Sequence, residues 1–171
     1  MSDAVESMPF CGERIVVRTD GSFDTVLDAL RRLMGTVALA EINDLANEPI
    51  SERDFSRRVE ERYVGKSGFM LFAEMDHGGW LSKFGINQRV VRWILGNPLL
   101  AITMIRHDIT AGLFAPVELL VVEESNQRGT TLTYVRPSSL MVIDDNAPLL
   151  AAARVLDAKL AALLADATNT A

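Results

Sequence analysis

Apolar residues recur every three or four positions in two segments of the chain, and this spacing predicts two helices that each bury one side. The first helix begins after Ser22, a residue type that caps helix starts, and is interrupted at Gly35, because glycine weakens a helix. The second helix covers about 147–165, with Pro148 in its first turn. Each helix needs a sheet or another helix against its apolar side.

Five shorter segments are rich in β-branched and aromatic residues and are bounded by turn residues, which predicts five strands. In the third segment Val91, Trp93 and Leu95 share one face, and Arg92 lies on the other. The order of elements, β-α(α)-β-β-β-β-α, predicts an α+β fold with a sheet of about five mainly antiparallel strands and helices packed on one face. The predicted strands cover residues 13–19, 69–75, 89–95, 117–122 and 130–135.

Composition narrows the classes of function. The chain carries 17 Lys and Arg against 23 Asp and Glu, a net charge of −6, and this balance disfavours a nucleic-acid partner because phosphate binding needs clustered positive charge. Cys11 is the single cysteine, so an internal disulfide and a thiolate-rich metal site are both excluded. Polar residues interrupt every long apolar stretch. We therefore expect a cytoplasmic protein with no membrane partner.

Two polar residues follow predicted strands where glycine or proline shapes the backbone. His77 lies in Asp76-His77-Gly78-Gly79, and Asn97 lies in Gly96-Asn97-Pro98. An imidazole can donate, accept or titrate near neutral pH, so His77 is the candidate catalytic residue and, with Asn97, a candidate ligand contact. Both also have a structural interpretation, in which His77 bonds a loop carbonyl and Asn97 bonds backbone amides in a turn.

Three further residues, Arg106, Tyr134 and Arg136, complete the predicted ligand-binding set. Tyr134 and Arg136 are two positions apart on the last strand and therefore share one face, where they could hold an anion or a planar ligand. The sequence has no phosphate loop ending in Gly-Lys-Ser/Thr and no Gly-x-Ser-x-Gly elbow. With two histidines and one cysteine, a zinc site would depend on carboxylates, so we predict no metal and no cofactor.

Several short motifs appear in the order in which a known family carries them. They are Gly21-Ser22-Phe23 with Thr25, Met75-Asp76-His77, Leu95-Gly96-Asn97-Pro98, Ala111-Gly112-Leu113 with Pro116, and Tyr134 with Pro137. On these motifs the chain resembles the bacterial and archaeal domain-of-unknown-function family 302. The resemblance implies a fold like that of the TATA-binding protein and a homodimer. It implies no activity, because the family has none established.

We interpret residues 1–171 as one domain, with a family-like core over about 13–140 and the C-terminal helix at about 147–165. The segment from about 36 to 67 is longer than the family's usual connection and is interpreted as a helical insertion. Within it, Ser51 and Asp54 resemble a capping box, and Phe55 and Val59 follow at helical spacing.

Three hypotheses of function follow. The first is a homodimeric domain, more a binding protein than an enzyme, that takes a small molecule or a protein partner into a cleft near His77 and Asn97. The second is an enzyme that uses His77 as general acid or base. The third is a structural or interaction protein that acts through the helical insertion.

Overall fold

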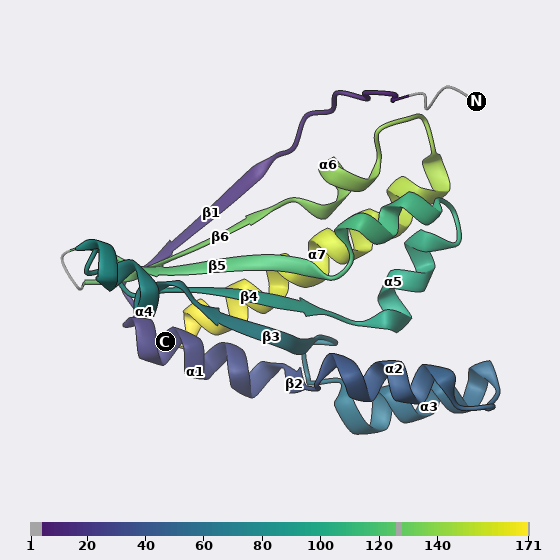
Figure 1. Cartoon of the computed structure of the whole chain (residues 1–171), viewed down its shortest axis with the longest axis horizontal. Coiled ribbons are helices and arrows are strands. Elements are labelled where there is room, and N and C mark those ends of the chain that lie inside the picture. The colour runs from purple at the N-terminus through teal and green to yellow at the C-terminus, as the bar shows by residue number, and fades with distance from the viewer. Residues whose placement is uncertain (1–4, 126–127, 171) are drawn as a thin grey trace.

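A six-stranded sheet forms the centre of the computed structural model, which describes residues 5–125 and 128–170 (Figure 1). The strand order is β1-β6-β5-β4-β3-β2, and every neighbouring pair is antiparallel except β2 with β3. The α+β class is confirmed, whereas the prediction of five strands is wrong by one. The strands are β1 (Arg14–Thr19), β2 (Gly35–Thr36), β3 (Met70–Asp76), β4 (Val90–Gly96), β5 (Val117–Glu123) and β6 (Thr130–Val135).

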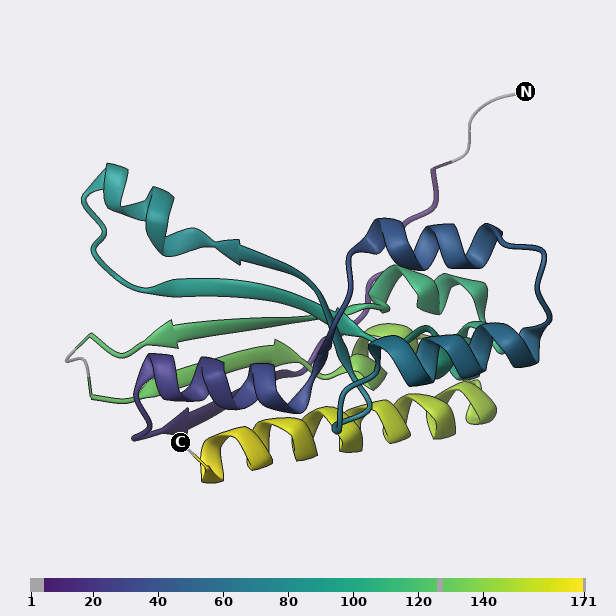
Figure 2. The ribbon, with the colours of Figure 1, turned by 90° about the horizontal axis from the view of Figure 1, so that it is seen from below.

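The two longest segments of apolar periodicity form helices that lie side by side on one face of the sheet, α1 and α7 (Figures 1 and 2). Ser22 caps α1 and Asn146 caps α7, since each side-chain oxygen accepts a backbone N–H of the first turn. The helices are α1 (Phe23–Leu33), α2 (Leu39–Asn47), α3 (Glu52–Tyr63), α4 (His77–Leu81), α5 (Pro98–Ile105), α6 (Pro137–Met141) and α7 (Ala147–Asn169), with 3₁₀ turns η1 (Ser82–Phe84) and η2 (Ile109–Phe114).

The main core lies between the sheet and these two helices. Trp93, Leu119 and Leu132 point from β4, β5 and β6 toward Leu30 of α1 and Leu160 of α7, and all five side chains are fully buried. Because side chains alternate along a strand, the positions between them point to the opposite face, which we call the open face. The predicted separation of Trp93 from Arg92 is therefore observed.

Helices α2 and α3 form an arm beyond the edge of the sheet, close to α5 (Figure 1). Ser51 caps α3 as predicted, with its Oγ accepting the Asp54 N–H at 3.1 Å. The arm has a smaller core of its own, made by Val37, Leu45, Val59 and Met70. The segment from 36 to 67 is therefore helical and is anchored to β3 through Met70.

Helix α7 is longer than the sequence indicated. It ends at Asn169 rather than near 165, because Leu164 and Ala167 are buried and hold its last turns against the core. In the part of the chain that the structure describes, no helix combines the length and apolar composition needed to cross a membrane.

Candidate functional site

His77 and Asn97 lie at opposite ends of the β3–β4 pair. Asp76, at the end of β3, pairs with Val91 near the start of β4, and Met70 pairs with Gly96 at the end of β4. The two ends are separated by five residues of strand, about 17 Å at the usual rise. The prediction of one cleft near both residues is therefore wrong, because two consecutive antiparallel strands run in opposite directions and so terminate at opposite ends of the sheet.

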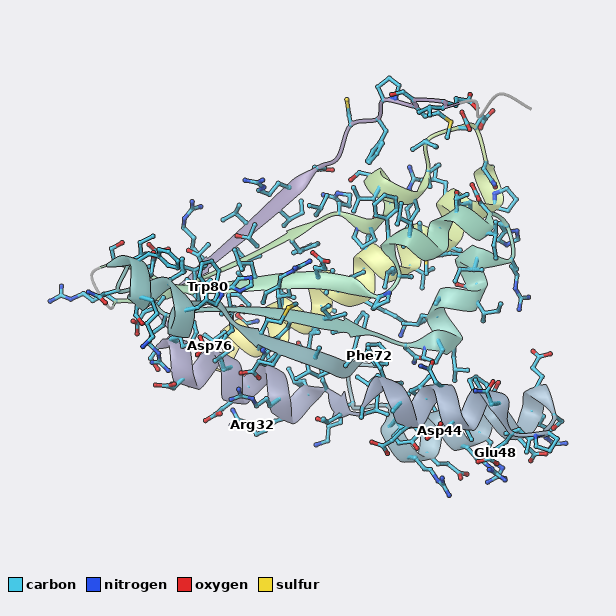
Figure 3. All side chains as sticks on the ribbon, in the orientation of Figure 1. Arg32, Asp44, Glu48, Phe72, Asp76 and Trp80 are labelled. Atoms are coloured by element: carbon cyan, nitrogen blue, oxygen red, sulfur yellow. The ribbon has the colours of Figure 1, made fainter. Side chains whose placement is uncertain are left out.

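The His77 end carries a short helical tip built on a side-chain cap. Asp76 accepts the Gly79 N–H at 2.9 Å and so begins α4. One turn later the Trp80 indole N–H donates to His77 Nδ1 at 3.2 Å, which places the proton of a neutral ring on Nε2. Figure 3 shows Asp76 and Trp80 together at this end of the strands. Asp76 therefore orients backbone rather than the imidazole.

Beside the tip, a polar groove between α1 and the ends of β3 and β4 is occupied by ion pairs. Arg31 donates to both carboxylate oxygens of Glu74, at 3.1 and 2.9 Å. Arg89 donates from both terminal nitrogens to Asp24, and this bond holds the pKa of the Asp24 carboxyl below its ordinary value, against the opposing effect of burial. The groove's two arginines are thus already paired.

The arginines of this groove also stack on aromatic rings. The Arg89 guanidinium carbon lies 4.4 Å from the centre of the Phe23 ring, and that of Arg31 lies 5.4 Å from the Trp93 ring. Such contacts fix the direction of a long side chain at the cost of its freedom to reach a ligand. We interpret the groove as a structural seam between α1 and the sheet.

At the other end, Asn97 begins α5 and joins it to the chain before β3. Its Oδ1 accepts the Leu99 N–H at 2.8 Å, and its Nδ2 donates to the Gly68 carbonyl at 3.0 Å. The residue is 8% exposed. The structural interpretation of Asn97 is observed, and the same side chain also borders a cavity.

That cavity, which we call the Asn97 pocket, has a volume of about 160 Å³ and lies where α2, α5, α7 and the start of β5 meet. Asn97 contributes the polar side chain of its lining, and none of the described lining residues carries an acid, a base or a nucleophile. The remaining lining residues are Leu39, Ile42, Phe72, Gly96, Pro98, Leu100, Ala101, Met104, Ala115, Pro116, Val117 and Leu156.

The other three predicted ligand contacts lie elsewhere and have structural partners. Arg106 is exposed at the end of α5, where its Nε donates to the Ile102 carbonyl at 3.2 Å. Tyr134 faces the main core rather than a ligand surface, and burial raises the pKa of its hydroxyl. Arg136 donates to Glu13 at 3.0 Å. The structure does not bring these residues together with His77 or Asn97.

Sequence reasoning missed most of the Asn97 pocket. Gly96, Pro98 and Pro116 belong to motifs quoted above, so part of the wall carried a signal. Leu39 and Ile42 carried no such signal, because their segment was interpreted as a separate insertion. Phe72 lies at an irregularity in the β3–β4 register, which the periodicity of the sequence does not indicate. Within the described residues, no three His, Cys, Asp or Glu side chains cluster as metal ligands would.

Comparison with known proteins agrees on one family and gives no activity. A family model described as "Domain of unknown function DUF302" matches residues 49–167. A similar solved structure is an uncharacterized conserved protein DUF302 from Bacillus stearothermophilus, with a TM-score of 0.61 and 16% identity, covering 90% of this chain and 97% of that chain. At this identity the likeness concerns the fold alone. No curated protein shows significant similarity.

Proposed function

We propose that this chain, which belongs to the DUF302 family as its motifs predicted, is a binding protein whose Asn97 pocket accepts a compact apolar part of a small molecule. One observation carries the proposal: an apolar pocket whose lining comes from three helices, α2, α5 and α7, and from the strands β3, β4 and β5. Ligand sites in proteins are concave and mostly apolar, with a few polar groups at the margin. The Asn97 pocket has this composition.

The size of the pocket limits the ligand. Its volume of about 160 Å³ is close to that of engineered apolar cavities of roughly 150 Å³, which stay dry and bind benzene. An aromatic ring or a short branched alkyl group would therefore fill it. The polar part of such a ligand would remain outside, since both functional groups of Asn97 already bond the backbone.

The chemistry of the lining favours binding over catalysis. General acid–base and nucleophilic mechanisms need a titratable or nucleophilic side chain within hydrogen-bond reach of the reacting atom. The Asn97 pocket offers an amide and a thioether, from Asn97 and Met104. His77 lies at the far end of β4, where its Nδ1 accepts from Trp80. The enzyme hypothesis therefore gains no support from this geometry.

We propose a role for the helical segment 36–67 in the same site. Leu39 and Ile42 of α2 form one wall of the Asn97 pocket, and Leu39 is 52% exposed although it is apolar. Outside the short β2–β3 ladder, the arm is held to the body by its small cluster around Met70. A ligand that contacts both walls would fix α2 against α5.

Titration of ¹⁵N-labelled protein with benzene, indole and isobutanol tests the proposal. We expect saturable shifts at Leu39, Ala101 and Met104 and a higher melting temperature, since a ligand that binds the folded state stabilises it. Ala101→Leu adds three carbons to the pocket wall and should abolish both effects. Ala158→Leu makes the same change at an exposed position of α7 and should leave them intact. Equal binding by both variants, or no binding by the wild type, would refute the pocket.

A second candidate function is self-association, favoured by the aromatic tip formed by His77, Trp80, Phe84 and Ile86. Trp80, Phe84 and Ile86 are 50%, 76% and 48% exposed, and Trp80 stacks edge-on with His77 and Phe84. Because a two-fold dimer buries the same patch of both copies, a self-complementary aromatic surface suits it. We propose this tip as the homodimer contact that the family resemblance implies.

Light scattering tests the self-association. Trp80→Ser with Phe84→Ser should give a monomer at concentrations where the wild type is a dimer. Ile109→Ser removes an apolar side chain that is 77% exposed elsewhere and should leave the dimer unchanged. A wild-type monomer across micromolar concentrations, or a dimer that survives the double variant, would exclude the tip as the contact.

We also propose the finer features that the sequence suggested for fold and compartment. The TATA-binding-protein-like arrangement is supported by five antiparallel strands with α1 and α7 on one face. A cytoplasmic setting is supported by Cys11, an exposed free thiol of the kind that a reducing compartment preserves. Superposition of an experimental structure and fractionation of the host cell test the two proposals.

A further inference from the structure

Strand β1 presents a free edge with unpaired backbone groups. It pairs with β6 over six residues without a bulge, and within residues 5–125 and 128–170 no strand neighbours its other side. Arg136 N–H donates to the Glu13 carbonyl at 2.8 Å, so Glu13 and Arg136 are a hydrogen-bonded pair of the β1–β6 ladder. Because bonded pairs alternate in an antiparallel ladder, Ile15 and Val17 bond β6, while Arg14, Val16 and Arg18 direct N–H and C=O outward.

The side chains of the outward-bonding residues form a short charged stripe. Arg14, Val16 and Arg18 point to the open face, while Ile15 and Val17 pack against the main core. Other arginines of the surrounding surface are paired, Arg92 with Glu118 and Arg136 with Glu13. Arg14 and Arg18 have no carboxylate partner among residues 5–125 and 128–170.

Space exists beside the stripe. A surface hollow of about 570 Å³ runs along the open face. Arg14, Val16 and Arg18 line one side of it, Val135, Thr133 and Thr131 lie opposite them on β6, and Leu120 lies one strand further, on β5. Val16 and Val135 are 40% and 37% exposed. A side chain placed opposite Val16 by a neighbouring strand would therefore contact Val16, with the positive charges of Arg14 and Arg18 on either side of it.

We propose that β1 accepts an extended segment of a partner protein as a seventh strand, with acidic residues opposite Arg14 and Arg18 and an apolar residue opposite Val16. Main-chain hydrogen bonds supply affinity when a peptide extends a sheet, and alternate side chains supply specificity. Opposite charges directly across a ladder stabilise the pairing. The recognised pattern is acidic-x-apolar-x-acidic.

A second copy of this chain does not fit the same edge. In the antiparallel register that pairs every outward-bonding residue, Val16 meets its equivalent and Arg14 of one copy meets Arg18 of the other. Like charges directly opposite each other destabilise a ladder. Basic residues of this kind are a common protection of edge strands against self-pairing. The surface therefore favours an acidic partner segment over its own copy.

Two seven-residue peptides test the proposal on the full chain, Ser-Glu-Thr-Val-Thr-Glu-Ser and its counterpart with lysines in place of both glutamates. Hydrogen exchange should be slow at the amides of residues 15 and 17 in the free protein, and the acidic peptide should slow it at 14, 16 and 18. Arg14→Glu with Arg18→Glu should weaken the acidic peptide and favour the lysine peptide, each by about tenfold.

A proline variant separates edge pairing from simple charge attraction. Val16→Pro removes one outward N–H and spares the bonds to β6, a position where edge strands tolerate proline. It should abolish slowed exchange at residues 14 and 18, whereas Val16→Thr should retain it; circular dichroism verifies that both variants fold. Equal affinity for both peptides, binding undiminished by Val16→Pro, or no slowed exchange at millimolar acidic peptide would overturn the proposal.

Discussion

Asn97 donates from Nδ2 to the carbonyl oxygen of Gly68 over 3.0 Å, and this bond joins the end of β4 to the segment that enters β3. The Oδ1 atom of the same side chain caps α5 through the Leu99 N–H. One buried amide therefore fixes two of the elements around the Asn97 pocket. A buried donor or acceptor that loses its partner costs more than the bond contributes on average.

The first prediction separates the two bonds of Asn97. Asn97→Ala removes both and should lower the free energy of unfolding by about 2–3 kcal/mol. Asn97→Ser keeps a capping oxygen for Leu99 and loses the bond to Gly68, so it should lose about half as much. Urea unfolding measures both. Equal losses in the two variants would show that the cap of the Leu99 N–H contributes nothing, and an Asn97→Ser protein as stable as the wild type would show that the bond to Gly68 contributes nothing.

The second prediction concerns the tip at His77. His77→Ala removes a half-buried acceptor of the Trp80 indole and should cost less than about 1 kcal/mol. Asp76→Ala removes the cap that begins α4 and should cost about 1 kcal/mol, with greater mobility at Gly79. Neither variant should change the binding of indole to the Asn97 pocket. A His77→Ala protein that no longer binds indole would restore a ligand role for this residue.

The third prediction tests a close crossing of two chain segments. A Cβ built on Gly35 would lie 1.7 Å from the Tyr63 carbonyl oxygen, and one built on Gly65 would lie 2.2 Å from Gly35 N. Both glycine N–H groups donate to the Phe69 carbonyl, so the backbones cannot separate without breaking these bonds. Gly35→Ala should destabilise the fold by about 3 kcal/mol or more, because the contacts are with backbone.

The control for this crossing is Gly112→Ala. A Cβ on Gly112 would meet its nearest neighbour, an Ile105 side-chain carbon, at 3.6 Å, an ordinary contact. Its effect on unfolding should stay within about 1 kcal/mol. A Gly35→Ala protein as stable as Gly112→Ala would mean that β2 does not pass the end of α3 as closely as described.

Local signals predicted the elements whose boundaries depend on local contacts. Ser22 and Ser51 cap the helices that their positions predicted. The alternation that placed Trp93 opposite Arg92 is correct because one face of β4 must meet the core. Strand β2 could not be predicted in this way, since its ladder depends on Met70 and Leu71, which lie about 35 positions later in the chain.

The candidate site was only partly predictable for the same reason. Asn97 and the turns around it carry their own sequence signal, but the α2 wall and Leu156 reach the Asn97 pocket through tertiary packing. His77 was grouped with Asn97 because each follows a strand. The inference that the two residues lie close together is wrong, because β3 and β4 are antiparallel and their final residues lie at opposite ends of the strand pair.

The final prediction concerns the acid limb of stability. Hydrogen bonding to Arg89 lowers the pKa of Asp24 below the ordinary value of 3.8. A lowered pKa means that the folded protein binds this proton less readily than the unfolded chain. The stabilisation is therefore complete above pH 3.8 and is lost as the pH falls from 3.8 through the lower pKa of the folded state.

Asp24→Asn should flatten this part of the curve. We expect the free energy of unfolding of the variant to fall less steeply below about pH 4 than that of the wild type, because the variant lacks the Asp24 carboxylate that acid would protonate. Asp20→Asn is the matched control, since Asp20 is exposed and has no ion pair in the described part of the chain. Urea unfolding from pH 2 to 7 measures all three proteins. An Asp24→Asn curve parallel to the wild type would show that the Asp24–Arg89 bond does not persist in solution.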